Sequence, residues 1–347
     1  MISLKPYKVK NLEVKNRIVM PPMCMYSADE EGYVQDFHKI HYGSRALGGL
    51  GLIIMEATAV EPKGRISDHD LGIWNDQHIQ GLSEIVDLAH GQEAKIGIQL
   101  AHAGRKCTAQ TDFTVSCSPL SYGKYRMPKE LSKEEIDDLV LKFQRAAKRA
   151  DEAGFDLVEI HAAHGYLIHQ FLSPLSNNRT DAYGGSLENR ARFLKEIASA
   201  IKKVWPSNKT ISLRVSATDY LEGGLNIDET EEIIKLVGPF IDLVHVSTGG
   251  LLPAKIKLFD GYQVRYATEL KKRLGLPTIA VGLINDLELA ESIVAEGRAD
   301  LVAMGRQILR EPQFVLNEIW KHKYNYGFPD QYERAYRYRS QDQIKDL

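Results

Sequence analysis

Eight short apolar runs, separated by stretches with helical periodicity, constrain the fold of this chain more strongly than any other feature. Each run is apolar at almost every position, which is typical of parallel strands that are covered on both faces. Eight strands that alternate with helices, without a break in composition, predict one α/β domain over residues 1–347, a (β/α)8 TIM barrel. The predicted strands cover residues 18–21, 52–56, 96–100, 157–160, 211–215, 243–246, 278–281 and 301–304.

Local signals mark where several of the intervening helices begin and end. Ser132 is followed three residues later by Glu135, the spacing of a capping box, so we expect a helix to begin there. Apolar residues recur at helical spacing between residues 187 and 204. Gly154 and Gly297 each precede a predicted strand, where glycines often end a helix.

A doubly wound sheet is the alternative arrangement, but it usually has fewer strands and a glycine-rich first turn. The sequence contains neither G-x-G-x-x-G nor a Walker A motif, so it supports neither type of nucleotide site. Two segments fall outside the alternation. Residues 106–129 form an irregular insertion after the third strand, which we expect to be a lid, and residues 325–347 form a C-terminal tail.

Composition excludes several classes of function. The net charge of -2 over 347 residues gives no basic field for nucleic acid. No apolar run is long enough to span a bilayer, and the first residues lack the apolar core of a signal peptide. Cys24, Cys107 and Cys117 form no paired framework. We therefore expect a cytoplasmic protein without nucleic-acid or membrane partners.

Polar side chains and glycines gather where the predicted strands end, and the opposite rim has no comparable set. In a barrel of this type, chemistry takes place at the carboxyl ends of the strands. We therefore expect an active site at this rim. In chain order, the candidates are Cys24, Tyr26, Ala57, Gln99, His102, Arg105, His161, His164, Tyr166, Arg214, Ser247, Gly249, Gly250, Gly282, Gly305 and Arg306.

Two imidazoles and a phenol follow the fourth strand. His161 and His164 can donate hydrogen bonds to a developing oxyanion, and Tyr166 can deliver a proton. The two histidines could instead bind a metal, since their spacing places them on one face of a helix. No H-x-H follows the first strand and no acidic residue ends the eighth, so we expect no metal. A structural role for either histidine alone stays open.

Gly282, Gly305 and Arg306 stand where barrels often bind phosphate. Glycine lets backbone N–H groups approach an anion, and arginine adds a forked charge. The same glycines could serve only tight turns, and position alone leaves both readings open. Gln99 and Arg214 can hydrogen-bond a planar heterocycle, although Arg214 could also form a structural ion pair in the barrel mouth.

Several segments resemble the Old Yellow Enzyme family of flavin-dependent ene-reductases. Residues 161–166 read HAAHGY, and residues 177–190 read NNRTDAYGGSLENR. Residues 22–26 read PMCMY, which resembles the bacterial subgroup, including thermophilic members, that carries a cysteine near the flavin. Residues 331–334, QYER, resemble a C-terminal signature of that subgroup. Matching segments recur along almost the whole chain.

The resemblance implies tightly bound flavin mononucleotide (FMN). Its phosphate would be bound by Gly282, Gly305 and Arg306. Arg214 would stabilise negative charge on the reduced ring. The thiol of Cys24 would tune the redox potential without acting as a covalent nucleophile, although a lone cysteine is otherwise most often a small buried hydrophobe. The implied ring contacts are Pro21, Pro22, Met23, Cys24, Ala57, Gln99 and Arg214.

The resemblance also implies an NADPH-dependent ene-reductase. NADPH and an α,β-unsaturated ketone or aldehyde would use one site in turn, with ping-pong hydride transfer through flavin N5, which accounts for the missing Rossmann motif. His161 and His164 would bind the carbonyl oxygen, and Tyr166 would donate the proton. Tyr26 and Arg334 would contact the substrate.

In the subgroup, the arginine of the QYER signature reaches into the neighbouring subunit's active site, which implies a homodimer or homotetramer here. The chain departs from the commonest pattern after Tyr336 and within the lid, so substrate preference does not transfer. One alternative is a flavin barrel that reduces nitro compounds or other electrophiles. Another is a non-redox phosphate-binding barrel. Dienoyl-CoA reductase relatives are disfavoured, because they carry an iron–sulfur cysteine cluster and an added nucleotide domain.

Four further residues are expected to have supporting roles. His102 and His169 would stabilise the fold around the site. Arg190 and Arg192 would anchor the long loop that precedes them through ion pairs, for example with Asp181.

Overall fold

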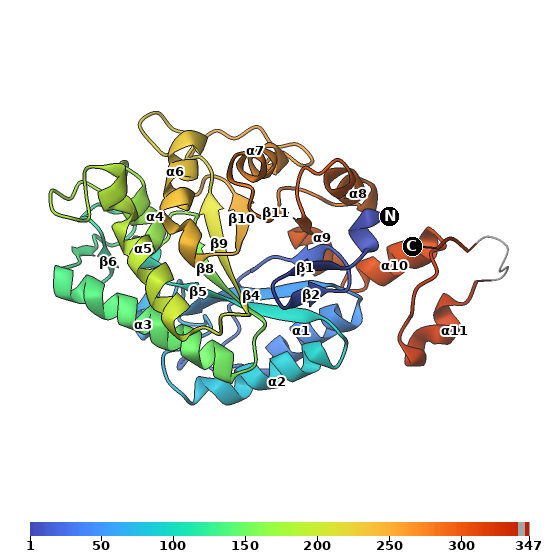
Figure 1. Cartoon of the computed structure of the whole chain (residues 1–347). Helices are drawn as coiled ribbons and strands as arrows, with labels where there is room; N and C mark the ends of the chain where they lie inside the picture. The colour runs from blue at the N-terminus through green and yellow to red at the C-terminus, as the bar shows by residue number, and fades with distance from the viewer. Residues whose placement is uncertain (339–343, 347) are drawn as a thin grey trace.

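A computed structural model describes residues 1–338 and 344–346. Eight parallel strands close into a barrel in which each strand pairs with the next along the chain and the last pairs with the first (Figure 1). All eight predicted strands are present, and the predicted (β/α)8 barrel is confirmed. The strands are β3 (Ile18–Met20), β4 (Leu52–Ala59), β5 (Lys95–Ala101), β8 (Leu157–Ala162), β9 (Thr210–Ser216), β10 (Leu243–Ser247), β11 (Thr278–Ala280) and β12 (Leu301–Ala303).

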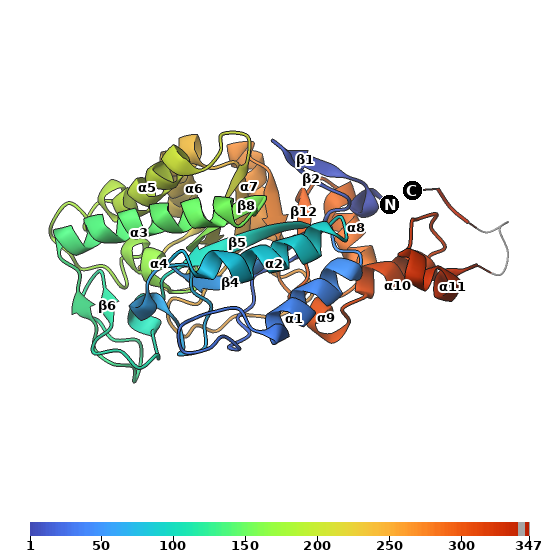
Figure 2. The same ribbon diagram turned by 90° about the horizontal axis from the view of Figure 1, so that it is seen from below.

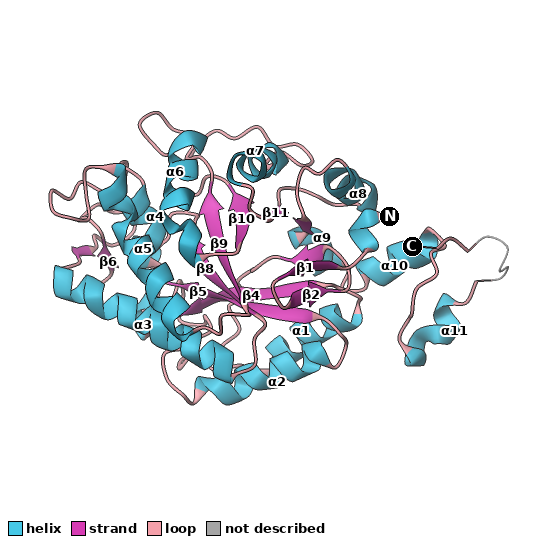
Figure 3. Ribbon diagram, viewed as in Figure 1, coloured by secondary structure: helices cyan, strands magenta, loops and turns pink. Residues whose placement is uncertain are grey.

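Helices surround the barrel, and Figure 3 shows them as an outer layer around the strands. The predicted capping box is confirmed: Ser132 Oγ accepts a hydrogen bond from the amide of Glu135, and the Glu135 carboxylate accepts one from the amide of Ser132. Gly154 and Gly297 follow helix ends as predicted. The helices of the layer are α1 (Asp36–Leu47), α2 (His78–His90), α3 (Lys133–Glu152), α4 (Leu167–Leu172), α5 (Leu187–Val204), α6 (Ile227–Val237), α7 (Val264–Leu274), α8 (Leu287–Ala295), α9 (Gly305–Arg310) and α10 (Phe314–Lys321).

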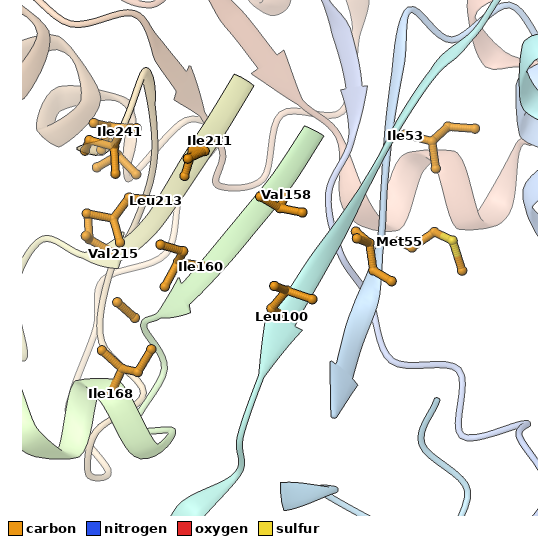
Figure 4. Packing of buried hydrophobic residues seen from close by; sticks show 14 of the residues in the cluster. Ile53, Met55, Leu100, Val158, Ile160, Ile168, Ile211, Leu213, Val215 and Ile241 are labelled. Carbon is orange, nitrogen blue, oxygen red and sulfur yellow. The ribbon is translucent and has the colours of Figure 1, made fainter. Parts of the chain in front are cut away.

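Successive residues of each barrel strand face opposite sides, which creates two separate apolar clusters. The larger cluster lies between the strands and the helices. Figure 4 shows part of it, with Val158 and Ile160 of β8 beside Ile211 and Leu213 of β9. The smaller cluster fills the barrel interior. Its members are Leu12, Val14, Val19, Leu52, Ile54, Leu157, Leu243, Ile279, Leu301 and Ala303.

An antiparallel hairpin, β1 (Tyr7–Val9) and β2 (Leu12–Val14), precedes the barrel and was not predicted. Leu12 and Val14 join the interior cluster, so the hairpin closes the barrel at the end where that cluster lies. Each strand has only three residues, too few for periodicity to reveal. The expected lid also contains two short paired strands, β6 (Val115–Ser116) and β7 (Lys129–Glu130).

The C-terminal tail carries a short helix, α11 (Glu333–Tyr336), after a 3-10 turn at Asp330–Tyr332. Tyr336 is buried and stacks on Phe328 with ring centroids 4.4 Å apart. Figures 1 and 2 place α11 beyond α10, outside the barrel. Residues 339–343 and 347 of the expected tail lie outside the described residues. Within the described part of the chain, no helix is both long and apolar enough to cross a membrane.

Candidate active site

A buried polar layer lies inside the barrel, nearer the carboxyl ends of the strands than the apolar interior cluster. Strand register brings it together. Gln99 is paired with Glu159 across β5 and β8, and Glu159 with Ser212 across β8 and β9. Arg214 is paired with His161 on one side and with His245 on the other. Because these residues come from adjacent strands, pairing alone fixes their proximity.

Above this layer, a cavity of about 260 Å³ opens at the ends of β10, β11 and β12. Four residues singled out from the sequence as cofactor ligands line it together: Arg214, Gly282, Gly305 and Arg306. The remaining lining residues are His164, Ser247, Thr248, Tyr262, Gln263, Val281, Leu283, Ile284, Asn285 and Ala303.

The lining of this cavity suits an anionic, hydrogen-bonding cofactor. The guanidinium Nε of Arg214 is buried and has no hydrogen-bond partner among the described residues. Gly282 has φ of 123°, and a Cβ there would lie 2.9 Å from the side chain of Gln263. Since a side chain at position 282 would close the space beside Gln263, the glycine keeps the cavity open for an occupant.

The two predicted histidines lie beside this cavity with Tyr166. The rings of His161 and His164 meet edge to face with centroids 5.3 Å apart, and the rings of His161 and Tyr166 do so at 5.0 Å. His164 Nε2 lies 2.8 Å from Ser247 Oγ, and His161 Nδ1 is buried without a partner among the described residues. The sequence prediction that these three side chains act together is consistent with this cluster.

The backbone of the loop after β8 is strained at His164. This residue has φ of 57°, which side chains other than glycine rarely adopt. Gly250 approaches so closely that a Cβ on it would lie 2.7 Å from the Cα of His164. The loop after β10 therefore supports the loop after β8, and a larger residue at position 250 would displace His164.

Both histidines are neutral in this environment. Burial lowers the pKa of His161 and of His164 well below the usual range, and the positive charge of Arg214 lowers each pKa further. A neutral imidazole donates through one ring nitrogen only, so each ring offers one donor. Burial also raises the pKa of Tyr166, so its phenol stays protonated at neutral pH.

Cys24 and Tyr26 follow β3 at the same rim. Burial is the main cause that raises the pKa of the Cys24 thiol, and the carboxylates of Asp70 and Glu56 raise it further. The thiol is thus protonated at neutral pH, which agrees with the expectation that it is not a nucleophile. Tyr26 is half exposed. Glu56 accepts a hydrogen bond from the amide of Met25 and thereby fixes this segment.

The cofactor ligands expected next to Cys24 also gather at this rim. Arg214 Nη1 lies 3.5 Å from the carbonyl oxygen of Pro22. A Cβ on Gly305 would lie 3.3 Å from the sulfur of Met23 and 3.6 Å from Pro21. Ala57 is paired with Gln99 across β4 and β5. Segments distant in sequence therefore meet at this rim.

Lys106 was missed as a residue of the site. Its ammonium donates hydrogen bonds to the carbonyl oxygens of His164, at 2.8 Å, and Gly250, at 2.5 Å. The ammonium also lies 5.5 Å from the ring centroid of Tyr166. Burial and the charge of Arg105 lower its pKa to about 8. A single lysine at the start of an irregular insertion gives no sequence signal for such contacts.

Gln263 and Thr248 were also missed. Gln263 Nε2 donates to Thr248 Oγ1 at 2.6 Å and reaches Ser247 Oγ at 3.3 Å. Gln263 precedes α7 and lies far in sequence from the carboxyl end of any strand. Residues chosen for their position at strand ends therefore do not include it. Thr248 follows Ser247 directly and could have been found by that rule.

The structure does not bring Arg334 to this cavity, because the residue is exposed on α11, outside the barrel. His102 and His169 have supporting contacts as expected: His102 Nε2 lies 2.9 Å from Glu61, and His169 Nε2 lies 3.0 Å from Asp219.

The expected partner of the loop arginines was wrong. Asp181 pairs with Arg179, whereas Arg190 pairs with Glu229 at 2.8 Å. Arg192 instead donates to the carbonyl oxygen of Ala182. The anchoring role itself agrees with these contacts, but Glu229 follows Arg190 by 39 residues and only the fold brings it close.

A group of potential metal ligands does come together elsewhere on the described residues: Glu288, Glu318 and His322, between α8 and the end of α10. This group includes neither His161 nor His164. Their ring contacts with each other and with Tyr166 involve no carboxylate.

Comparisons with known proteins show the family of this chain. A family profile described as the NADH:flavin oxidoreductase / NADH oxidase family matches residues 4–325, and the chain belongs to that family. The NADPH dehydrogenase of Clostridium acetobutylicum is 53% identical over 97% of this chain and 100% of its own length. The NADPH dehydrogenase of Bacillus subtilis is 48% identical over 95% of this chain and 98% of its own.

Solved structures with the same fold include morphinone reductase, with a TM-score of 0.79 and 28% identity over 91% of this chain and 88% of that one. A 2-naphthoyl-CoA reductase gives a TM-score of 0.87 and 30% identity over 90% of this chain, which spans about half the length of that protein (51%). The expected membership of the Old Yellow Enzyme family is confirmed. The chain is an oxidoreductase of the NADPH dehydrogenase type, and its cofactor is FMN.

Proposed function

We propose that this enzyme is an ene-reductase, which uses NADPH to reduce the C=C bond of α,β-unsaturated ketones and aldehydes. The observation that carries the proposal is the cluster of two neutral imidazoles and one protonated phenol beside the cavity that Arg214, Gly282 and Arg306 line. The names of the morphinone reductase and NADPH dehydrogenase relatives agree with this class of reaction.

His161 and His164 bind the carbonyl oxygen of the alkene substrate. Each neutral ring donates one hydrogen bond, and two donors on one oxygen draw electron density from the conjugated double bond. Because both rings are buried, these hydrogen bonds act in a medium that weakens them less than water would. The β-carbon therefore becomes a better hydride acceptor.

Tyr166 supplies the proton to the α-carbon. Its pKa lies above the usual range, so the phenol carries its proton at neutral pH. The edge-to-face contact with His161 fixes the phenol ring near the imidazole that holds the substrate oxygen. A proton donor positioned in this way shortens the transfer and excludes bulk water from it.

The remaining residues hold the cofactor and the substrate. FMN would supply the hydride-transfer chemistry between NADPH and the β-carbon of the alkene. Gly282, Gly305 and Arg306 would hold its phosphate, and Pro21, Pro22, Met23, Ala57, Gln99 and Arg214 would hold its ring. Cys24 would tune its reduction potential. Tyr26 contacts the substrate.

NADPH and the alkene use the same position in turn, so the kinetics are ping-pong. The enzyme acts in the cytoplasm as a homodimer or homotetramer, in which Arg334 enters the site of the neighbouring subunit. The exposed position of α11, outside the barrel, supports a role away from this subunit's own cavity.

The visible spectrum of the purified protein tests the proposal. A yellow flavin band should bleach with anaerobic NADPH and return when cyclohexenone is added. Bleaching that cyclohexenone does not reverse would leave a flavin reductase with another oxidant, such as a nitro compound. No flavin band after reconstitution with FMN would contradict the proposal as a whole.

A further inference from the structure

We propose that Glu159 is a positioning residue of the flavin site: it orients Gln99, balances the charge of Arg214 and thereby lowers the reduction potential of the bound flavin. Glu159 lies in the polar layer beneath the cavity and was not among the candidates drawn from the sequence. The inference rests on the proposed function, because Gln99 and Arg214 must contact the flavin ring.

Glu159, on β8, is the common hydrogen-bond acceptor for side chains of three other strands, β5, β9 and β10. Its Oε1 accepts a hydrogen bond from Gln99 Nε2 at 2.9 Å. Its Oε2 lies 3.1 Å from Ser212 Oγ and 3.0 Å from His245 Nδ1. Gln99 is 1% exposed and the other three residues are fully buried. These contacts satisfy both oxygens of the buried Glu159 carboxylate, whereas His245 Nε2 has no hydrogen-bond partner among the described residues.

The charges of the network compensate each other without a direct ion pair. Arg214 forms no salt bridge among the described residues, yet it is buried and keeps its charge. Burial favours protonation of Glu159, but His245, Arg214 and Ser212 outweigh it and hold the pKa below the usual range. Burial and Arg214 lower the pKa of His245. The layer therefore holds one cation, Arg214, and one anion, Glu159.

The carboxylate also decides which end of the Gln99 side-chain amide is bound to Glu159 and which end is free. An ionised carboxylate can only accept hydrogen bonds, so the Gln99 NH₂ group must point to Glu159. The carbonyl oxygen of Gln99 is then left to face the cofactor. A neutral amide at position 159 could donate a hydrogen bond to the carbonyl oxygen of Gln99 instead. The Gln99 side-chain amide could then rotate and exchange the positions of its NH₂ and C=O groups.

Glu159 opposes reduction of the flavin electrostatically. A flavin gains negative charge when it is reduced, which Arg214 favours and Glu159 disfavours. The substitution Glu159→Gln removes the anion with little change in shape. It should therefore leave Arg214 without compensation and raise the reduction potential.

Anaerobic equilibration of the holoenzyme with a reference dye measures the reduction potential of the flavin, and it therefore tests the effect of the negative charge of Glu159. In Glu159→Gln, the equilibrium should shift toward reduced flavin on the order of tenfold. Glu159→Asp keeps the charge, so its potential should stay near that of the wild type. Glu61→Gln is the matched control, since Glu61 is also a buried carboxylate that binds a histidine, His102, and its potential should not change.

Retention of FMN tests whether Glu159 orients the side-chain amide of Gln99. Glu159→Gln should release FMN more readily on dilution, with binding about tenfold weaker, because a misoriented Gln99 loses one hydrogen bond. Wild-type potential and wild-type FMN retention in Glu159→Gln would overturn the inference, even if the wild type reduces cyclohexenone as proposed. A wild type that binds no FMN would contradict the proposed function itself.

Ser212→Ala provides a second test if Glu159→Gln does not fold. This variant removes one hydrogen-bond donor to Glu159 and keeps the negative charge of its carboxylate. Without the Ser212 hydrogen bond, that negative charge is less well neutralised. The potential should move in the opposite direction, to a more negative value. An unchanged potential in this variant would overturn the role of Glu159.

Discussion

His164 Nε2 lies 2.8 Å from Ser247 Oγ, so a side-chain contact joins the loop after β8 to the end of β10. Gln263 Nε2 donates toward the same oxygen at 3.3 Å. Since Ser247 accepts from Gln263, its own proton is free to be donated to His164 Nε2. With Ser247 as the donor to Nε2, the imidazole proton would lie on Nδ1, where the proposed mechanism needs a donor for the substrate oxygen.

Removal of this donor should slow reduction of the alkene. In His164→Ala, reoxidation of the NADPH-reduced enzyme by cyclohexenone should fall about 10²-fold, as expected for a lost donor to a developing oxyanion. Stopped-flow absorbance of the flavin measures this step. His164→Asn retains an N–H donor and should lose less. Full alkene turnover in His164→Ala would show that the assigned role is wrong.

Removal of the Tyr166 phenol should separate the two half-reactions. In Tyr166→Phe, reduction by NADPH needs no proton from the phenol and should stay close to the wild-type rate. Reoxidation by cyclohexenone should fall by about 10²-fold or more, the usual effect of a lost general acid. Tyr26→Phe, at the same rim but half exposed, should affect KM more than the rate of this step. Equal losses in both half-reactions of Tyr166→Phe would contradict a proton-donor role.

Arg334 should matter only in an assembly. In Arg334→Ala, the KM for cyclohexenone should rise several-fold while the protein keeps its oligomeric state in light scattering, since a single charge at an interface rim mainly affects substrate contact. Arg337→Ala is the matched control, because Arg337 is exposed three residues further on and pairs with Glu333. Unchanged kinetics of Arg334→Ala in a confirmed oligomer would count against a shared site.

Buried neutral histidines should make the fold sensitive to acid. Burial lowers the pKa of His41 to about 3, and burial likewise lowers the pKa of His38, His161, His164 and His245. A histidine whose folded pKa is lowered contributes stability above its unfolded pKa of about 6.5, and this is lost as pH falls. The free energy of unfolding should therefore drop between pH 6.5 and 5, and His41 alone should contribute at most about 1.4 kcal/mol per pH unit.

The substitution His41→Phe tests this pH dependence of stability by removing one buried imidazole. His41 Nε2 has no hydrogen-bond partner among the described residues and the ring stacks on Phe37, so phenylalanine should fit. Urea unfolding of the variant should show a pH slope that is smaller by about one proton. A slope identical to that of the wild type would mean that His41 is already protonated in the folded state or does not titrate in this range.

The fold and the cluster of His161, His164 and Tyr166 could be predicted because their signals are local in the chain. The eight strands are continuous apolar runs, and the helix at Ser132 carries its own cap. His161 is the penultimate residue of β8, and His164 and Tyr166 follow within five residues, so any barrel must bring them to one rim. The hairpin β1–β2 escaped prediction because three residues are too few to show a period.

Tertiary structure alone decided which distant residues share the site. Gln99 and Glu159 are 60 residues apart, and Glu159 and His245 are 86 apart. They meet because barrel closure fixes the register between neighbouring parallel strands, and a shift by one residue would turn each side chain to the opposite face. The sequence by itself determined the strands, several caps and the placement of His161, His164 and Tyr166 near the end of β8. The register of the closed barrel decided the partners of Glu159, the contacts of Lys106 and the presence of Gln263 in the cavity.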